Sequence, residues 1–292
     1  MNTPVRLAGF GLGLVAVFGA ALGLGRVVGP DVTAPPPATH DTHSDGAHGT
    51  DGHEAEGHEA GGLAIAQDGY RLAPLTDALS STDTQPFRFR IIGPDEATVT
   101  AFTPTHERDL HLIVVRRDLT GYQHLHPERA PDGTWQTPLK VAAPGDYRVF
   151  ADFRPTGRDE PLTLGADVPA AGDYRPAPLP GPGFRDEVDG YTVTLDGDAQ
   201  TGAFTFTVSR DGAPVTDLEP YLGANGHLIA LRDGDLGYLH VHPEDGPGLR
   251  FTAEIPSPGT YRLFLDFQHR GTVRTAAFTI TTEHGEPGHT HG

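Results

Sequence analysis

An internal repeat constrains this chain more than any other feature of its sequence. The stretch His111-Leu-Ile-Val-Val-Arg-Arg-Asp-Leu-Thr-Gly-Tyr-Gln-His-Leu-His-Pro127 returns as His227-Leu-Ile-Ala-Leu-Arg-Asp-Gly-Asp-Leu-Gly-Tyr-Leu-His-Val-His-Pro243. Downstream, Pro144-Gly-Asp-Tyr-Arg-Val-Phe-Ala-Asp-Phe153 returns as Pro258-Gly-Thr-Tyr-Arg-Leu-Phe-Leu-Asp-Phe267. The duplication predicts two copies of one fold, each of about 100 residues, which is a usual size for a β-sandwich.

Both copies show alternating or β-branched runs between Gly- and Pro-rich turns, and neither shows a helical period. We therefore expect an all-β chain with two tandem immunoglobulin-like sandwiches, or a related barrel, at residues 62–168 and 184–282. A Pro/Gly linker at 169–183 joins them. The expected strands of the first domain are 70–73, 87–92, 98–103, 110–116, 122–126, 135–141, 147–153 and 162–168. Those of the second are 191–195, 204–209, 221–222, 227–231, 238–242, 249–255, 261–267 and 276–281.

The terminal segments differ in composition from the two domains. Residues 7–25 are uncharged and would span about 28 Å as a helix, so residues 1–29 predict a transmembrane anchor, or alternatively a signal segment. We expect a single-pass membrane protein with an extracytoplasmic body, or else a secreted one. Residues 30–61 and 283–292 are rich in His, Gly and acidic residues, and we expect both to be disordered.

Charge and composition narrow the possible partners. The net charge of −18 argues against nucleic acid, which requires clustered Lys and Arg. The chain has no cysteine, and its single methionine is Met1, so it offers no soft sulfur ligands in its body. Any metal site must therefore use imidazole and carboxylate groups.

The repeated histidines are the candidate site. His124 and His126 are two residues apart on one predicted strand, so their side chains share a face and can reach one ion. If Arg116 pairs with Gly121 across a hairpin, His111 falls opposite His126 on that face, whereas a slip of one residue moves His111 to the other face. The favourable register predicts one three-histidine site per domain, suited to Cu(II) or Zn(II). The candidate ligands of the second domain are His227, His240 and His242.

Two carboxylates could complete these sites. Asp152 and Asp266 occupy the same place in the repeated Phe-x-Asp-Phe segment, as fourth ligands or as partners that orient a ligand. A purely structural role is the alternative, because histidines near strand ends often bond to backbone or to a buried carboxylate, and duplication would preserve them too.

The repeated motifs carry a family resemblance. His-Leu-Ile-Val-Val-Arg-x-Asp-Leu, His-Leu-His-Pro and Pro-Gly-x-Tyr-Arg-x-Phe-x-Asp-Phe resemble the signature of bacterial, largely actinobacterial, membrane-anchored or secreted proteins described as heavy-metal-binding or copper-associated. The match is good in the first domain and looser in the second, where Val114-Val-Arg-Arg-Asp-Leu119 becomes Ala230-Leu-Arg-Asp-Gly-Asp235. The resemblance implies an extracytoplasmic location and metal handling.

Two functions are compatible with these features. The first is an extracytoplasmic, membrane-anchored protein that buffers or delivers Cu(II) or Zn(II). The alternative is a non-catalytic cell-surface interaction module in which the histidines are structural. An enzyme is not expected, because the sequence has no serine elbow, phosphate loop or His-Glu-x-x-His motif.

Overall fold

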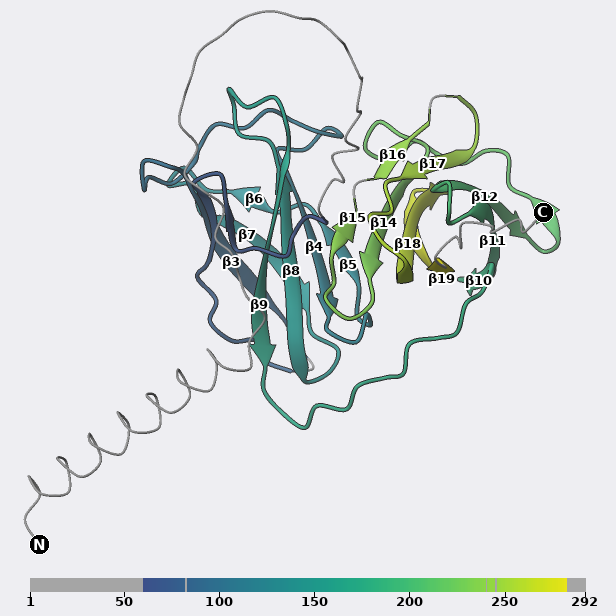
Figure 1. Cartoon of the computed structure of the whole chain (residues 1–292), viewed down its shortest axis with the longest axis horizontal. Coiled ribbons are helices and arrows are strands. Elements are labelled where there is room, and N and C mark those ends of the chain that lie inside the picture. Colours follow the sequence, from purple (N-terminus) through teal and green to yellow (C-terminus); the bar gives the residue numbers. More distant parts are fainter. Residues whose placement is uncertain (1–59, 82, 240, 245, 283–292) are drawn as a thin grey trace, which may run out of the picture. The chain divides into compact units, whose positions relative to one another are not determined.

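The computed structural model describes residues 60–282 apart from positions 82, 240 and 245 (Figure 1). These residues form strands and turns, and no helix occurs among them. Accordingly, the described part of the chain holds no helix of the length and apolar character that crossing a bilayer requires. The predicted anchor at 1–29, residues 30–59 of the predicted His-rich linker and the His-rich tail at 283–292 lie outside the described residues, as does His240. The linker was predicted to reach residue 61, but Gly61 already forms a bridge with Tyr238.

The first domain is built from nine strands in two antiparallel sheets. One sheet has the order β1-β2-β3-β7-β6 and the other the order β5-β4-β8-β9. The strands are β1 (Ala66–Gln67), β2 (Tyr70–Pro74), β3 (Thr84–Ile92), β4 (Leu110–Arg116), β5 (Gln123–Leu125), β6 (Glu128–Arg129), β7 (Trp135–Lys140), β8 (Gly145–Phe153) and β9 (Leu162–Ala170). Side chains of both sheets meet in one core, so the domain is sandwich-like.

The second domain repeats this arrangement and adds one short strand, β13. Its sheets have the orders β10-β11-β12-β17-β16 and β15-β14-β18-β19, with β13 paired to β12. The strands are β10 (Arg185–Val188), β11 (Tyr191–Asp198), β12 (Ala203–Arg210), β13 (Ala213–Pro214), β14 (His227–Arg232), β15 (Tyr238–Leu239), β16 (Val241–Pro243), β17 (Leu249–Ala253), β18 (Gly259–His269) and β19 (Thr272–Thr282). The duplicated Tyr-Arg-x-Phe-x-Asp-Phe segments lie on β8 and β18, which hold the same position in their sheets.

Three predicted strands need correction. Residues 98–103 and 221–222 form only isolated bridges. His106, just after the first segment, and Leu222, within the second, have left-handed backbones that interrupt an extended strand. The predicted strand 238–242 is divided between two sheets, since β15 pairs with β14 whereas β16 pairs with β17. The short strands β1, β6, β10 and β13 were not predicted.

A third apolar cluster joins the two domains. Strand β4 is buried along its whole length, as its continuous apolar run predicts. Leu112 and Val114 enter the core of the first sandwich, while Ile113 and Val115 point the other way. There they pack on the equivalent sheet of the second domain, in an interdomain cluster of Ile113, Val115, Leu119, Phe150, Ile229, Leu231, Leu236, Tyr238 and Phe264. The outer face of each four-stranded sheet is thus covered by the other domain.

The interdomain contact uses the same residues from both copies of the repeat. Tyr122 of the first domain stacks on Phe264 of the second, with ring centroids 4.1 Å apart and ring planes 6° apart. The equivalent pair, Tyr238 of the second domain and Phe150 of the first, has centroids 5.6 Å apart. An exchange of equivalent residues across a contact is the property of a two-fold interface, here formed within one chain.

Candidate functional site

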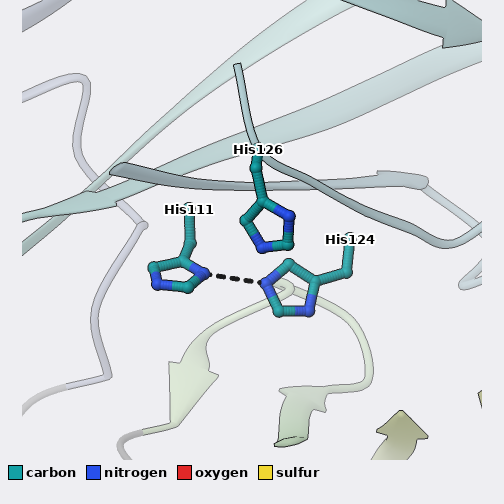
Figure 2. Close-up of side chains that lie close together, drawn as sticks. All are labelled: His111, His124 and His126. Carbon is teal, nitrogen blue, oxygen red and sulfur yellow. Dashed lines mark hydrogen bonds between the residues drawn. The ribbon is translucent and has the colours of Figure 1, made fainter. Parts of the chain in front are cut away.

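Strands β4 and β5 bring three histidines together. Leu112 pairs with Leu125 and Ile113 with His124, which is the register in which His111 falls opposite His126. Figure 2 shows the three rings gathered at this end of the sheet. One ligand atom from each of His111, His124 and His126 can be chosen so that all lie within 4.8 Å of one another. We call these three residues the histidine group, and no other such set of His and acidic ligand atoms occurs among the described residues.

Hydrogen-bond partners fix the tautomers of two of these rings. Nε2 of His111 lies 3.0 Å from the carbonyl oxygen of Thr105, which can only accept, so this nitrogen carries the hydrogen. Nδ1 of His124 lies 2.9 Å from a carboxylate oxygen of Asp266 and donates to it. In neutral rings the remaining nitrogens, Nδ1 of His111 and Nε2 of His124, then both carry lone pairs. They face each other at 3.0 Å (Figure 2).

Asp266 belongs to the second domain, although it acts on a ring of the first. Its side chain is only 2% exposed. One carboxylate oxygen accepts from His124 and from the hydroxyl of Tyr122 at 3.2 Å, and the other accepts from the hydroxyl of Thr275 at 2.5 Å. The pair His124–Asp266 places a carboxylate behind an imidazole, an arrangement that orients the ring and strengthens it as a cation ligand.

A fourth and a fifth imidazole border the histidine group. His227 begins β14 and is buried, and its ring centroid lies 5.9 Å from that of His124 and 6.3 Å from that of His111. His106 lies on an exposed turn with a left-handed backbone, and its ring centroid is 5.0 Å from that of His227. A small cavity of about 70 Å³ between the domains is lined by His106, His111, His124, Asp152 and His227, among others.

Burial favours the neutral form of three of these rings, those of His111, His126 and His227. The pKa of His111 falls from its ordinary 6.5 to about 3, mainly because the ring is buried and secondarily because His124 lies beside it. The same two causes lower the pKa of His126 to about 3 and that of His227 to about 4. Neutral imidazoles are the form that binds metal ions. In addition, Nε2 of His126 is buried and has no hydrogen-bond partner.

Asp152, the repeat equivalent of Asp266, has a different environment. It pairs with His111 across the β4–β8 ladder, as Asp266 pairs with His227 across β14–β18. Its carboxylate accepts a hydrogen bond of 3.2 Å from Thr163, and burial raises its pKa to about 6. Asp152 thus faces the cavity, whereas Asp266 is bound to the histidine group.

The structure places the two described histidines of the second predicted site, His227 and His242, on different sheets, and His240 lies outside the described residues. The ring of His227 lies beside the first domain's histidines, with its centroid 5.9 Å from that of His124. His242 is exposed on β16 and pairs with Thr252 of β17, in the other sheet of the second domain. The reason is that the chain changes sheets earlier in the second domain. Its last residue paired with β14 is Leu239, and Val241 already pairs with β17. In the first domain the equivalent of Val241, Leu125, still pairs with β4. Pro243 is tolerated there because β16 is an edge strand, where a missing N–H costs little.

Sequence reasoning missed two members of this region. His106 has no counterpart in the repeat, since Leu222 occupies the equivalent turn, so the comparison of the two copies passed over it. Tyr122 was visible as a repeated residue on the face of His124, and that shared face was the signal for its contact with Asp266.

Solved structures give only distant likenesses. The Escherichia coli adhesin FdeC is 15% identical, with 75% of this chain and 66% of that chain covered and a TM-score of 0.25. A marsupial T cell receptor is 10% identical (72% and 62% covered, TM-score 0.24), and an I-band fragment of titin is 10% identical (73% and 64% covered, TM-score 0.20). The chain spans just under two thirds of the length of these structures. Scores at this level do not establish a common fold over the matched length.

Sequence comparison identifies a family. No curated protein matches the chain significantly. Residues 65–172 and 186–284 each match the family described as "Domain of unknown function (DUF8832)", and together they make up more than half of the chain. The chain therefore belongs to this family and carries two copies of its domain.

Proposed function

We propose that this protein binds a divalent metal ion, Cu(II) or Zn(II), at the histidine group. The observation that carries the proposal is the contact between Nδ1 of His111 and Nε2 of His124 at 3.0 Å. Because Thr105 and Asp266 take the hydrogens on the far sides of these rings, two lone pairs face each other. Only a cation between them makes such a contact attractive, and it is either a proton or a metal ion.

The geometry is close to that of a tetrahedral centre. Two nitrogens held at about 2.0–2.1 Å from one tetrahedral ion lie roughly 3.3 Å apart, and the ring centroids lie roughly 5 Å apart. The three centroid distances in the histidine group are 5.2, 5.1 and 4.9 Å. Three imidazoles without any sulfur ligand suit Zn(II) or Cu(II), and a carbonyl and a carboxylate behind the rings orient them as such sites require.

The cellular role follows from the sequence. The uncharged segment at 7–25 and the resemblance to membrane-anchored or secreted metal-associated proteins support an anchored, extracytoplasmic location. The His-rich segments at 30–61 and 283–292 would gather ions loosely beside a defined site. We infer buffering or delivery of the ion, without catalysis.

A specific observation favours a second candidate, a cell-surface interaction module with structural histidines. The pair His124–Asp266 links the two domains, and both ring nitrogens of His111 and of His124 have a partner. The strand order β2-β3-β7-β6 against β5-β4-β8-β9 corresponds to the A-B-E-D and C′-C-F-G order of immunoglobulin-like sandwiches, which often serve as surface modules. In this alternative the histidines only hold the domains together.

Equilibrium dialysis with metal analysis separates the two candidates. The full chain is dialysed against limiting Zn(II) or Cu(II), beside a variant carrying His124→Gln and His126→Gln. A second variant, His242→Gln, is the matched control, because this histidine is exposed on another sheet. The proposal predicts that the double variant loses one high-affinity equivalent and that the control keeps it. An unchanged stoichiometry in the double variant would return these histidines to a structural role.

A further inference from the structure

His227 presents a lone pair to the same region as the histidine group, from the other domain. Its Nε2 lies 2.9 Å from the carbonyl oxygen of Tyr221, just as Nε2 of His111 lies 3.0 Å from that of Thr105. A carbonyl only accepts, so Nε2 of His227 carries the hydrogen and Nδ1 carries the lone pair. Equivalent carbonyl groups of the two repeats therefore orient His227 and His111 in the same way, each with Nδ1 available as a ligand.

The position of His227 suits a shared ion. Its ring is 8% exposed, and the cavity that borders it is also lined by His111 and His124. The cavity volume of about 70 Å³ exceeds the roughly 10–15 Å³ that a single small occupant such as a water needs. The ring centroid of His227 lies 5.9 Å from that of His124 and 6.3 Å from that of His111, which is about 1 Å beyond the roughly 5 Å expected in a tetrahedral centre.

We propose that His227 is the fourth ligand, so that imidazoles of both domains hold one ion. This inference rests on the proposed function and specifies how the site is completed. Four imidazoles would form the closed, four-coordinate shell of a Zn(II) site, or an all-nitrogen site for Cu(II), with no position left for a substrate. The ring of His227 must approach the other rings by about an ångström when the ion binds.

His106 is the competing candidate for the fourth position. Its ring centroid lies 6.1 Å from that of His111 and 5.0 Å from that of His227. However, its ring lies on an exposed turn, whereas the ring of His227 is buried and oriented by the carbonyl of Tyr221. The buried and oriented ring is the better ligand, since it loses less conformational freedom when it binds the ion.

The test uses Co(II) as a spectroscopic probe on the full chain. Tetrahedral Co(II) gives intense visible bands, whereas five- or six-coordinate Co(II) in the His-rich segments gives weak ones. Wild type is compared with His227→Gln, His106→Gln and the control His242→Gln. We expect the visible bands of His227→Gln to shift, because water takes the place of one imidazole, and its affinity to fall by more than the about 10–100-fold that loss of a merely orienting residue costs. The other two variants should keep the wild-type bands and affinity.

The outcomes separate the inference from the function on which it rests. If wild type shows no tetrahedral site that depends on His124 and His126, the proposed function fails. If wild type shows one and His227→Gln matches it in bands and affinity, the inference is overturned while the function stands. A shift of the bands with weaker binding in His106→Gln alone would assign the fourth position to His106 and overturn the inference. X-ray absorption of the wild-type Zn(II) complex tests the same point without a variant, since four imidazoles support the inference and three contradict it.

Discussion

The imidazole of His124 in the first domain donates a hydrogen bond of 2.9 Å to the carboxylate of Asp266 in the second. The two residues are 142 positions apart in sequence, and both side chains are at most 5% exposed. This one contact orients a ring of the candidate metal site and also connects the two halves of the repeat. Changes at Asp266 should therefore affect metal affinity and domain association together.

Replacement of Asp266 by Asn should weaken metal binding by about 10–100-fold and destabilise the chain. The amide keeps the size of the side chain but loses the charge and an acceptor for His124, Tyr122 or Thr275. Asp152→Asn is the matched control from the repeat. Burial raises the pKa of Asp152 to about 6, so removal of its charge at pH 7 should be neutral or stabilising. Chemical denaturation and metal titration measure both effects, and equal losses in the two variants would contradict this assignment.

Stability of the metal-free chain should fall as pH decreases below 6.5. Unfolded histidines titrate near 6.5, whereas the folded chain holds the pKa of His111 and His126 at about 3 and that of His227 at about 4. Between these values the unfolded chain binds more protons, so the free energy of unfolding falls by at most about 1.4 kcal/mol per pH unit for each histidine.

One group opposes this trend. Asp152 has its pKa raised from 3.8 to about 6, so the folded chain holds the extra proton in that window and gains stability there as pH falls. Three histidines outweigh one carboxyl group, and the net change is a loss. Denaturation midpoints at pH 7, 6, 5 and 4 measure it, with the His111→Gln variant as the control that should show a shallower slope. A stability that is flat over this range would show that the buried rings do not carry the titration.

From the sequence, the arrangement of His111, His124 and His126 could be predicted, but the residues that the second domain adds to the site could not. The hairpin between Arg116 and Gly121 limits the register to two choices, and the structure has the one that gathers His111, His124 and His126. The apolar run of β4 predicted burial on both faces, but could not say that a second domain provides the second cover. The spacing of apolar residues shows which face of a strand is buried, but it does not show which other domain packs against that face. For this reason the contact from Asp266 and the approach of His227 were not predicted.

The second domain shows a different limit of prediction. The repeat suggested that His242 would behave as His126 does, because the two motifs are spaced identically. Strand β16 nevertheless joins the sheet of β17, so that His242 pairs with Thr252. The position at which the chain changes sheets depends on whether pairing with β14 or with β17 is more favourable for each residue. The repeated spacing of the motif does not determine this position.

The stack of Tyr122 on Phe264 should contribute measurably to stability. Tyr122→Phe keeps the ring and loses the hydrogen bond to Asp266, which should cost about 1 kcal/mol. Tyr122→Ala also loses the stacked ring, and for this partly buried residue we expect up to about 3 kcal/mol, at or below the range for fully buried aromatic residues. Chemical denaturation measures both. An alanine variant no less stable than the phenylalanine variant would show that the stack contributes nothing.

Charge on the outer face of β4 should separate the domains without unfolding them. Ile113→Lys buries a charge in the interdomain cluster, whereas Leu112→Lys places it in the core of the first sandwich. The first variant should retain its β-sheet circular dichroism and gain protease sensitivity in the exposed linker around residues 171–182, and the second should lose its fold. If both variants unfold alike, the domains do not exist as separable units.

The most direct test of the metal proposal is an anomalous difference map measured at the zinc edge from crystals of the full chain grown with Zn(II). The account predicts one strong peak about 2.0–2.1 Å from Nδ1 of His111, Nε2 of His124 and a ring nitrogen of His126. A map without a peak among these rings, at a zinc concentration that loads sites elsewhere on the chain, would contradict it.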